Sequence, residues 1–584
     1  MVQCIADNIC SPLGWNTEEN FAAVREGRSE LRLHDAQSWS LQEPFVASLF
    51  PQNAVTKRFS DAFPHVKEPL SRFEKLAILS IYDAIQKTSV ELRSPDVIFI
   101  LASTKGNVEL LDDKNQPDIP RDRVRLGLTA ESIARFFGNP NTPLVVSNAC
   151  ISGIHAQILA TRLLEMGTYR YAVVCGCDVQ SRFIISGFQS FKALSSQPCK
   201  PFDRHRDGLN LGEGAATMVL TSVNIPQKDA WIVCNGAVRN DANHISGPSR
   251  TGEGSYRALA TICAKQKEQL AFINVHGTAT PYNDEMEAIA LERAELLSAP
   301  VNALKGYFGH TMGAAGILET ILSFKAVEAK IVLPTRGFNE LGVSKPVSVV
   351  DKESPTDKKQ FIKLLSGFGG CNGAIRWKQV GNEAERSCSN HASVVHLTPI
   401  HRVKITPTQV IVDDLLIETK GGEGDLLTRL YKEKVKDYPK FYKMDGLSKL
   451  GLIATELLIQ GGGQQNEDCL PENTAIVFIG RSGSLADDRK YQETIQTQKN
   501  FFPSPAVFVY TLPNIVTGEV AIKHKTYGET AFYALEKKDD VLIHHLLQTV
   551  CCDTTTEKII GGWLEYESED CFEADLCLYQ IGKK

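Results

Sequence analysis

Features that mark several other protein classes are missing from this chain of 584 residues. No apolar stretch is long enough to cross a bilayer, and no signal pattern opens the sequence. A formal net charge of −6 leaves no basic footprint for nucleic acid. The 15 cysteines have no paired zinc-site spacing. We therefore expect no membrane span, no nucleic-acid partner, no bound metal, and reduced thiols in the cytoplasm.

The remaining composition is that of a globular protein with more than one domain. Hydrophobic residues make up 43% and charged residues 23%, and the length exceeds what one ordinary core supports. Residues 1–380 alternate apolar runs, such as 97–101 and 171–175, with amphipathic helical runs. This pattern predicts an α/β fold with a mostly parallel sheet covered by helices. A polar stretch, 381–395, is expected to be a linker to a second domain, 396–584.

The second domain is predicted to repeat part of the first. Residues 449–454 echo 75–80, and 475–480 echo 97–102. The same order of elements recurs, but only for the first half of the first domain. We match the segment Gly-Glu-Thr-Ala-Phe-Tyr at 528–533 to the Ser-Asn-Ala-Cys at 147–150. The second copy has no thiol there, so we expect it to be catalytically inactive.

Cys150 is the first candidate for chemistry. An apolar run ends at Ser147, and a helical run begins near Ile154, so the thiol lies at a strand-to-helix turn. There the helix dipole and free N–H groups lower a thiol pKa and can hold an oxyanion. This makes Cys150 a candidate acyl-carrying nucleophile. A buried cysteine that only packs as a small hydrophobe is the alternative.

Two histidines and a glycine-rich loop strengthen the catalytic interpretation. His276 follows the apolar run 272–275, at the end of a strand where α/β proteins place active-site groups. His310 lies among small residues in the segment 305–316. In the loop 366–373, three glycines, at 367, 369 and 370, surround Phe368, a composition able to offer backbone N–H groups to a ligand.

These motifs, in this order, resemble the Cys-His-His β-ketoacyl-acyl-carrier-protein synthases of the thiolase-fold superfamily. The resemblance covers residues 1–380, and several independent motifs in family order carry it. It rests on the following segments: 11–14, 149–153, 200–208, 212–215, 241–248, 276–278, 305–316 and 367–370. It implies a layered αβαβα fold, and an acyltransferase that condenses an acyl thioester with malonyl-acyl-carrier protein in fatty acid, polyketide or aryl-polyene synthesis.

The resemblance also implies a role for each site residue. Cys150 would take the acyl group, and its N–H with that of Phe368 would form the oxyanion hole, Phe368 also acting as a gate. His276 and His310 would assist decarboxylation and stabilise the enolate, because neutral imidazoles donate hydrogen bonds without being strong bases. The polar network would comprise Lys305, Asp284 and Glu319. The pantetheine arm would bind Thr278 and Thr280.

The implied partners are an acyl carrier protein, delivering acyl and malonyl groups on its phosphopantetheine, and either a second copy or the chain's own C-terminal domain. No cofactor bound by the enzyme itself is expected. The C-terminal domain resembles an inactive chain-length factor and would shape the acyl tunnel, or would merely stabilise the fold. Cys371 and the segment 302–304 depart from the family pattern, which bears on substrate detail. A thiolase-type acyltransferase, a Cys-His hydrolase and a non-catalytic scaffold are the alternatives.

Overall fold

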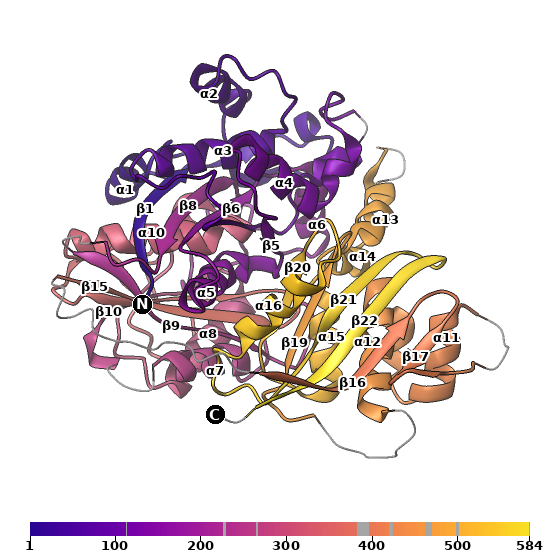
Figure 1. Cartoon of the computed structure of the whole chain (residues 1–584). Coiled ribbons are helices and arrows are strands. Elements are labelled where there is room, and N and C mark those ends of the chain that lie inside the picture. Colours follow the sequence, from indigo (N-terminus) through magenta and orange to yellow (C-terminus); the bar gives the residue numbers. More distant parts are fainter. Residues whose placement is uncertain are drawn as a thin grey trace.

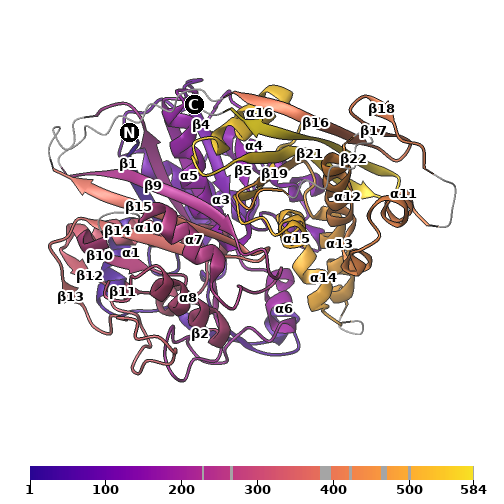
Figure 2. The same ribbon diagram turned by 90° about the horizontal axis from the view of Figure 1, so that it is seen from below.

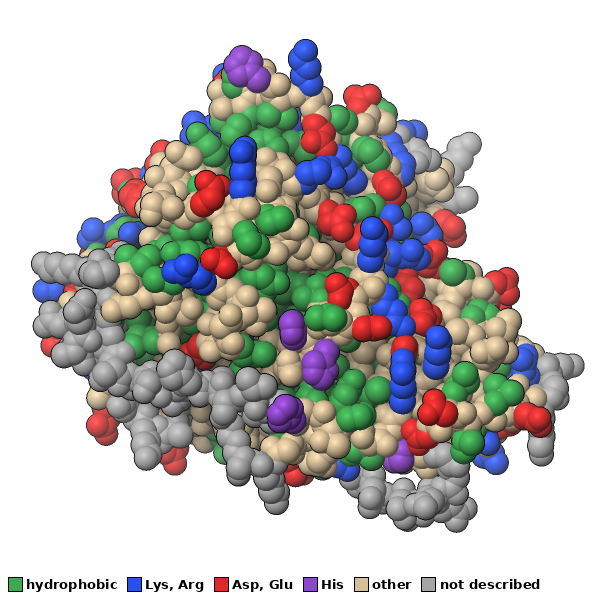
Figure 3. All heavy atoms as spheres, viewed as in Figure 1, with side chains coloured by type: hydrophobic (Ala, Val, Ile, Leu, Met, Phe, Trp, Pro, Cys, Tyr) green, Lys and Arg blue, Asp and Glu red, His purple; other side chains and the backbone are tan. Residues whose placement is uncertain are grey.

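The computed structural model describes residues 1–112, 114–225, 229–263, 267–381, 396–419, 424–461, 470–497 and 501–582. Nearly all of the predicted linker, 382–395, lies outside these residues. Within them, the helices are too short or too polar to traverse a bilayer. On the face shown in Figure 3, Lys and Arg side chains alternate with Asp and Glu and form no broad basic surface.

One sheet of the first domain carries the strand that leads to Cys150. Its order is β1 (Gln3–Cys10), β8 (Gly214–Thr221), β6 (Tyr171–Asp178), β4 (Val97–Ala102) and β5 (Leu144–Val146). β4 is buried at every position, which explains its continuous apolar run. β4 is parallel to β5 and β6, whereas β8 is antiparallel to both neighbours. The sheet is therefore mixed, and the prediction of a mostly parallel sheet was wrong.

A second sheet carries the histidine and glycine-rich loops. Its order is β9 (Ala230–Asn240), β15 (Cys371–Val380), β14 (Gln360–Ser366), β10 (Leu270–Asn274) and β11 (Val301–Asn302). A short pairing of β1 with β9 connects the two sheets. The pairing of β14 with both β10 and β15 brings the loops after β10 and β14 to the same edge.

Helices form three layers around these two sheets. The central pair, α5 (Ser152–Glu165) and α10 (Ala315–Glu328), is almost wholly buried between the sheets. The outer layers are α3 (Arg72–Ile85) with α4 (Leu126–Phe136), and α7 (Glu253–Ile262) with α8 (Pro281–Arg293). Figure 2 shows α7 and α8 beyond the second sheet. The predicted layered αβαβα fold is confirmed.

The C-terminal domain repeats the first sheet. Its order is β16 (Leu397–Ile405), β22 (Cys571–Ile581), β21 (Lys558–Ser568), β19 (Ala475–Gly480) and β20 (Thr530–Ala534). Each pairing has the same sense as its counterpart in the first domain. On this sheet α12 (Gly446–Gln460) takes the place of α3, and α16 (Asp540–Val550) that of α5. The described part holds no counterpart of the second sheet, in agreement with a partial repeat.

The two copies join edge to edge beside the nucleophile. β20 pairs antiparallel with β5, with Tyr533 opposite Val146 and Ala534 opposite Val145. The N–H of Ser147 donates to the carbonyl of Phe532 at 3.1 Å. Figure 1 shows the yellow and orange C-terminal domain lying alongside the indigo and magenta first domain. The C-terminal domain therefore pairs with the first domain of the same chain.

The strand register corrects our alignment of the copies. Gly480 of β19 pairs with Ala534, as Ala102 of β4 pairs with Val146. β5 ends at Val146 with α5 beginning at Ser152, and β20 ends at Ala534 with α16 beginning at Asp540. The counterpart of the nucleophile turn is thus 535–539, not 528–533, and Lys538 occupies the place of Cys150. Lys538 pairs there with Glu573 and Asp575, so the second copy still has no thiol.

Candidate active site

Cys150 lies in a short 3-10 turn, Ala149–Ile151, between β5 and α5. Ala149 has a φ of 48°, a left-handed conformation that L residues rarely adopt, and it turns the chain sharply toward the helix. The backbone of Gly367 approaches this turn closely: a Cβ there would lie 3.1 Å from the Cys150 nitrogen. The glycine-rich loop and the nucleophile turn are therefore in contact.

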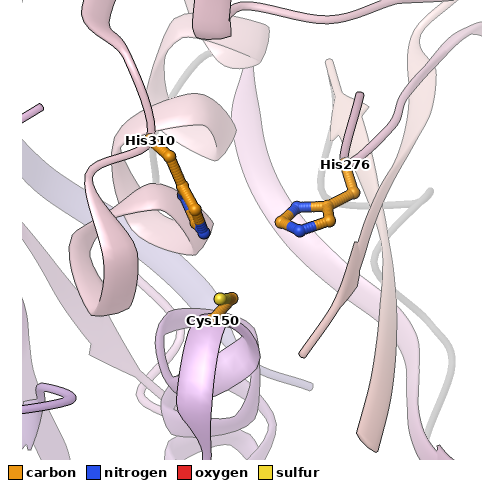
Figure 4. Close-up of side chains that lie close together, drawn as sticks. All are labelled: Cys150, His276 and His310. Carbon is orange, nitrogen blue, oxygen red and sulfur yellow. The ribbon is translucent and has the colours of Figure 1, made fainter. Parts of the chain in front are cut away.

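Both predicted histidines face the thiol. His276 leaves the end of β10 and His310 follows α9 (Lys305–Phe308), and Figure 4 shows both rings directed at Cys150 above the start of α5. Ligand atoms of the three side chains lie within 4.8 Å of one another. The two ring centroids are 5.1 Å apart and nearly perpendicular. The structure thus brings together three residues that are far apart in the sequence.

Hydrogen bonds orient each histidine. The Met312 N–H donates to His310 Nδ1 at 3.3 Å, so the ring proton of neutral His310 lies on Nε2, which has no partner and faces the site. The backbone N–H groups of His276 and Gly277 both donate to the Glu287 carboxylate, at 2.7 Å each. These contacts leave ring nitrogens available to a substrate oxygen.

The electrostatics of the site favour neutral groups. Burial, with the neighbouring lysine ammoniums, holds the pKa of His276 and of His310 well below the usual value. Burial also raises the pKa of the Cys150 thiol to about 12, with Lys305 opposing the shift and Asp178 adding to it. Our expectation of a lowered thiol pKa was therefore wrong, because desolvation outweighs the turn's favourable N–H groups.

Lys305 and Glu319 lie where the resemblance expects them, and Asp284 does not. The Lys305 ammonium donates to Glu319 Oε1 at 2.9 Å, and both side chains are buried. Asp284 instead accepts from the Phe202 N–H at 2.8 Å and lies 3.7 Å from Arg206. Asp284 therefore orders a neighbouring loop and is not part of the lysine network.

A cavity of about 380 Å³ opens onto Cys150. Its walls include both histidines, and Thr278 and Thr280, whose hydroxyls are 2.9 Å apart, also line it. Phe368 lines it as well, with its ring 5.5 Å from that of Phe191. The mainly apolar walls with a few converging polar groups are typical of a small-molecule site.

Three further residues contact the site residues and were not predicted from the sequence. Glu287 is only three residues beyond Asp284 on α8, so the sequence could not tell which of the two carboxylates faces the His276 loop. Lys363 donates to Glu319 Oε2 at 2.6 Å; a lysine inside the apolar run of β14 was the available signal. Asn514, from the C-terminal domain, donates to the Phe368 carbonyl at 2.8 Å, and nothing in the sequence indicated it.

The departures from the family pattern also lie at the site. Cys371 is buried, and its sulfur lies 3.5 Å from the Asn148 carbonyl oxygen and 3.3 Å from that of Phe368, so its single S–H proton lies between the nucleophile turn and the glycine-rich loop. Asn302 accepts from the Asn274 side chain at 2.8 Å. A thiol and two imidazoles this close together could also hold a metal ion.

Two family models match the chain. "Beta-ketoacyl synthase, N-terminal domain" covers residues 2–224, and "Beta-ketoacyl synthase, C-terminal domain" covers residues 231–339. The chain belongs to the β-ketoacyl synthase family. The resemblance to the β-ketoacyl synthases is thereby confirmed.

The curated relatives agree with this assignment. The chain is 31% identical over 414 residues to 3-oxoacyl-[acyl-carrier-protein] synthase 2 of Vibrio cholerae, covering 63% of this chain and 97% of the relative. It is 29% identical to the mitochondrial 3-oxoacyl-[acyl-carrier-protein] synthase of Arabidopsis thaliana, covering 45% of this chain and only 61% of that relative.

Solved structures share the fold. The PfaC keto synthase-chain length factor is 13% identical with a TM-score of 0.78, covering 99% of this chain and 78% of PfaC. AntDE, a ketosynthase solved with its type II polyketide acyl-carrier protein AntF, is 18% identical with a TM-score of 0.54, covering 65% of this chain and 99% of that one. The match to PfaC extends over both of this chain's domains, so the fold of both is shared.

Proposed function

We propose that the chain is a 3-oxoacyl-[acyl-carrier-protein] synthase that condenses an acyl group on Cys150 with malonyl-acyl-carrier protein. The observation that carries the proposal is the convergence of Cys150, His276 and His310 on one mainly apolar cavity. A nucleophile for the acyl group and two neutral donors for an enolate are what this reaction needs.

The reaction proceeds in two transfers. In the first, the Cys150 sulfur attacks the acyl thioester; the carrier thiol leaves and takes up the proton that Cys150 releases. In the second, malonyl loses CO2, and the electron pair of the broken C–C bond passes to the thioester enolate. The enolate carbon attacks the acyl-Cys150 carbonyl and expels the sulfur, which takes up one proton. The raised pKa of Cys150 favours this last protonation.

The imidazole donors act on the enolate oxygen. His310 Nε2–H faces the cavity, and Glu287 fixes the backbone from which His276 projects. In a buried site, removal of one such donor typically costs on the order of 10²–10³ in rate. The N–H groups of Cys150 and Phe368 are proposed to hold the second oxyanion, on the acyl carbonyl, and the Thr278 and Thr280 hydroxyls to bind the pantetheine arm.

The C-terminal domain is proposed to support the nucleophile turn. Arg162 of α5 makes a two-point ion pair with Glu529 of the second copy, at 2.8 and 2.9 Å. His155 bridges from Tyr533, at 3.1 Å, to the Asn148 side chain, at 3.0 Å. The Asn148 amide also donates to the Thr530 carbonyl at 2.8 Å, so the second copy would fix the residue two positions before Cys150.

The same domain is proposed to close the acyl-binding end of the cavity, as a chain-length factor would. Phe508 of α14 (Pro505–Tyr510) packs on Phe188, with ring centroids 5.7 Å apart, and Phe188 lines the cavity. Phe508 also fills the space beside Gly187, where a Cβ would lie 2.1 Å from its ring. An aromatic wall supplied by the second copy would limit the length of the acyl chain.

A thiolase-type reaction is the second candidate, and the geometry disfavours it. That chemistry needs a second reactive cysteine, and Cys371 is the nearby thiol. Cys371 is 1% exposed, lies against two carbonyl oxygens and, unlike Cys150, is not among the residues that line the cavity. We further propose a cytoplasmic enzyme that holds no metal or other cofactor and receives its substrates on the phosphopantetheine of an acyl carrier protein.

The test is a condensation assay. Acyl- and malonyl-carrier proteins are mixed with the enzyme, and CO2 release and the 3-oxoacyl product are followed by mass spectrometry. The wild type should form product, and Cys150→Ala should form none; Cys371→Ala, the matched control, should still form it. A wild type without product, or a Cys150→Ala variant that condenses, rejects the proposal.

A further inference from the structure

A fully buried lysine lies directly behind the catalytic histidines. Lys363 is on β14, paired with Asn274 of β10 and Ile375 of β15, and its side chain is 0% exposed. Its ammonium donates to Glu319 Oε2 at 2.6 Å, Asn274 Oδ1 at 2.6 Å and the Val275 carbonyl at 3.2 Å. These three oxygen acceptors match the three N–H groups of the charged form.

Lys363 shares its carboxylate with Lys305. Glu319 accepts Lys305 on Oε1 and Lys363 on Oε2. Both lysines hold the pKa of Glu319 below normal against the effect of burial. Burial lowers the pKa of Lys363 to about 8; below that pH, two ammoniums and one carboxylate leave one positive charge without a direct counter-ion. A buried charge of this kind is costly unless something compensates it.

The other ionisable groups around this cluster do not cancel that charge by contact. Glu287 of α8 accepts backbone N–H groups, and burial raises its pKa to about 7. Burial raises the pKa of Asp284 to about 6, and Arg206 lies beside that carboxyl. The rings of His276 and His310 face Cys150, and both lysines lower their pKa values. The extra charge therefore acts on the two imidazoles.

Lys363 is also tied to the backbone that carries His276. Val275, whose carbonyl accepts the ammonium, immediately precedes His276. Asn274 is held on its other side by Asn302, through its Nδ2 at 2.8 Å. A continuous chain of contacts thus runs from Asn302 through Asn274 to Lys363 and Glu319, beneath the end of β10.

We infer that Lys363 is a positioning residue of the condensation: with Lys305 it places a net positive charge behind His276 and His310, directed at the malonyl carboxylate and the enolate formed from it. The inference rests on the proposed function. When the C–C bond to the carboxylate breaks, negative charge moves onto the enolate oxygen, and the two imidazoles meet it as neutral donors. Lys363 transfers no proton in this step; its field stabilises the charge and keeps the imidazoles unprotonated.

The test separates the two half-reactions. For Lys363→Met we measure two reactions from about pH 5 to 9. The first is the acylation of Cys150 by a carrier protein loaded with an acyl group, and the second is condensation with a carrier protein loaded with malonyl. Condensation should fall about tenfold or more, while acylation stays within about threefold. Removing a nearby positive charge raises imidazole pKa values, so the acid limb of the condensation profile should move to higher pH by roughly one unit.

Two further variants keep the test decisive. Asn274→Asp places a carboxylate beside Lys363 and cancels the extra charge without removing the lysine, so the acid limb should move in the same direction. Lys105→Met is the matched control: it removes another buried ammonium, paired with Asp488 of the C-terminal domain, and the acid limb should stay where it is. Thermal unfolding of all three variants reports the loss of structure.

The outcomes distinguish the two levels of proposal. A wild type that never releases CO2 rejects the proposed function itself. An active wild type, with Lys363→Met or Asn274→Asp losing both half-reactions equally and keeping the acid limb, rejects the role of Lys363. If Lys363→Met does not fold, the pH at which the acid limb of the condensation profile lies in Asn274→Asp decides the question.

Discussion

A single methyl group in the C-terminal domain should damage catalysis in the first. Gly518 lies in α15 (Ile515–His524), against the glycine-rich loop that follows β14. A Cβ on Gly518 would be 2.4 Å from the Gly369 carbonyl oxygen and 2.9 Å from its Cα. Gly369 has a φ of 89°, and the clashing atoms are backbone. Either the loop or the helix must therefore move in Gly518→Ala.

The displacement sets the expected size of the effect. Restoring ordinary contact from 2.4 Å requires a shift approaching 1 Å. Overpacking of this kind costs about 1–3 kcal/mol, and replacing a helical glycine returns about 0.5–1 kcal/mol. A misplacement of about 1 Å at a catalytic group can cost about 10²-fold. We expect kcat to fall about 10- to 100-fold while the free energy of unfolding drops by at most about 2.5 kcal/mol.

Gly446→Ala, at the start of α12, is the matched control for this prediction. Its added Cβ would lie 2.1 Å from the Tyr566 ring on β21, so it overpacks the same domain without pressing on α15 or the Phe368 loop. Steady-state condensation and chemical denaturation are measured for both variants. Equal kcat in the two variants, at similar stability, would refute the claim that the second copy positions the catalytic loop.

Three further predictions concern the nucleophile and the join between the copies. Because the Cys150 pKa is raised to about 12, its alkylation by iodoacetamide should rise with pH through pH 9 without a plateau; a plateau below about pH 8 contradicts the raised pKa. Glu529→Gln leaves the buried Arg162 short of its counter-ion and should cost about 3–5 kcal/mol in chemical denaturation. Arg162 and His155 hold the Glu529 pKa far below normal despite burial. The contribution of Glu529 to the free energy of unfolding is therefore present above about pH 4 and is lost as the pH falls. A Glu529→Gln variant as stable as the wild type near pH 7 contradicts this role. Phe508→Ala should lengthen the longest product seen by mass spectrometry, and an unchanged product distribution counts against the chain-length role.

Most residues of the candidate site could be predicted from the sequence because short local motifs mark them. Cys150 at a strand-to-helix turn and His276 at a strand end follow from runs of residue types that can be recognised without a structure. Asp284 and Glu287 are three residues apart and lie on the same face of α8, but Asp284 meets the Phe202 loop and Glu287 meets the His276 loop. Which loop each carboxylate meets is fixed only by packing.

The pKa of Cys150 and the alignment of the two copies could not be predicted from the sequence, because both also depend on packing. The helix-start position of Cys150 predicts a lowered thiol pKa, but desolvation by the surrounding protein raises it, although the residue is partly exposed to the cavity. In the second copy no thiol marks the turn, so the alignment of the two copies from the sequence was wrong. The pairing of Ala534 with Gly480 gives the correct alignment. The lysine in the apolar run of β14 was visible, yet its partner Glu319 is 44 positions away.

The most direct measurement of the central claim is the mass of the enzyme after incubation with a carrier protein that is loaded with an acyl group, without malonyl-carrier protein. If Cys150 carries the growing chain and the second copy is inactive, the intact protein gains one acyl group, and peptide mapping finds it on Cys150. An acyl group on another residue, a second one on the C-terminal domain, or an unmodified wild type would contradict the account.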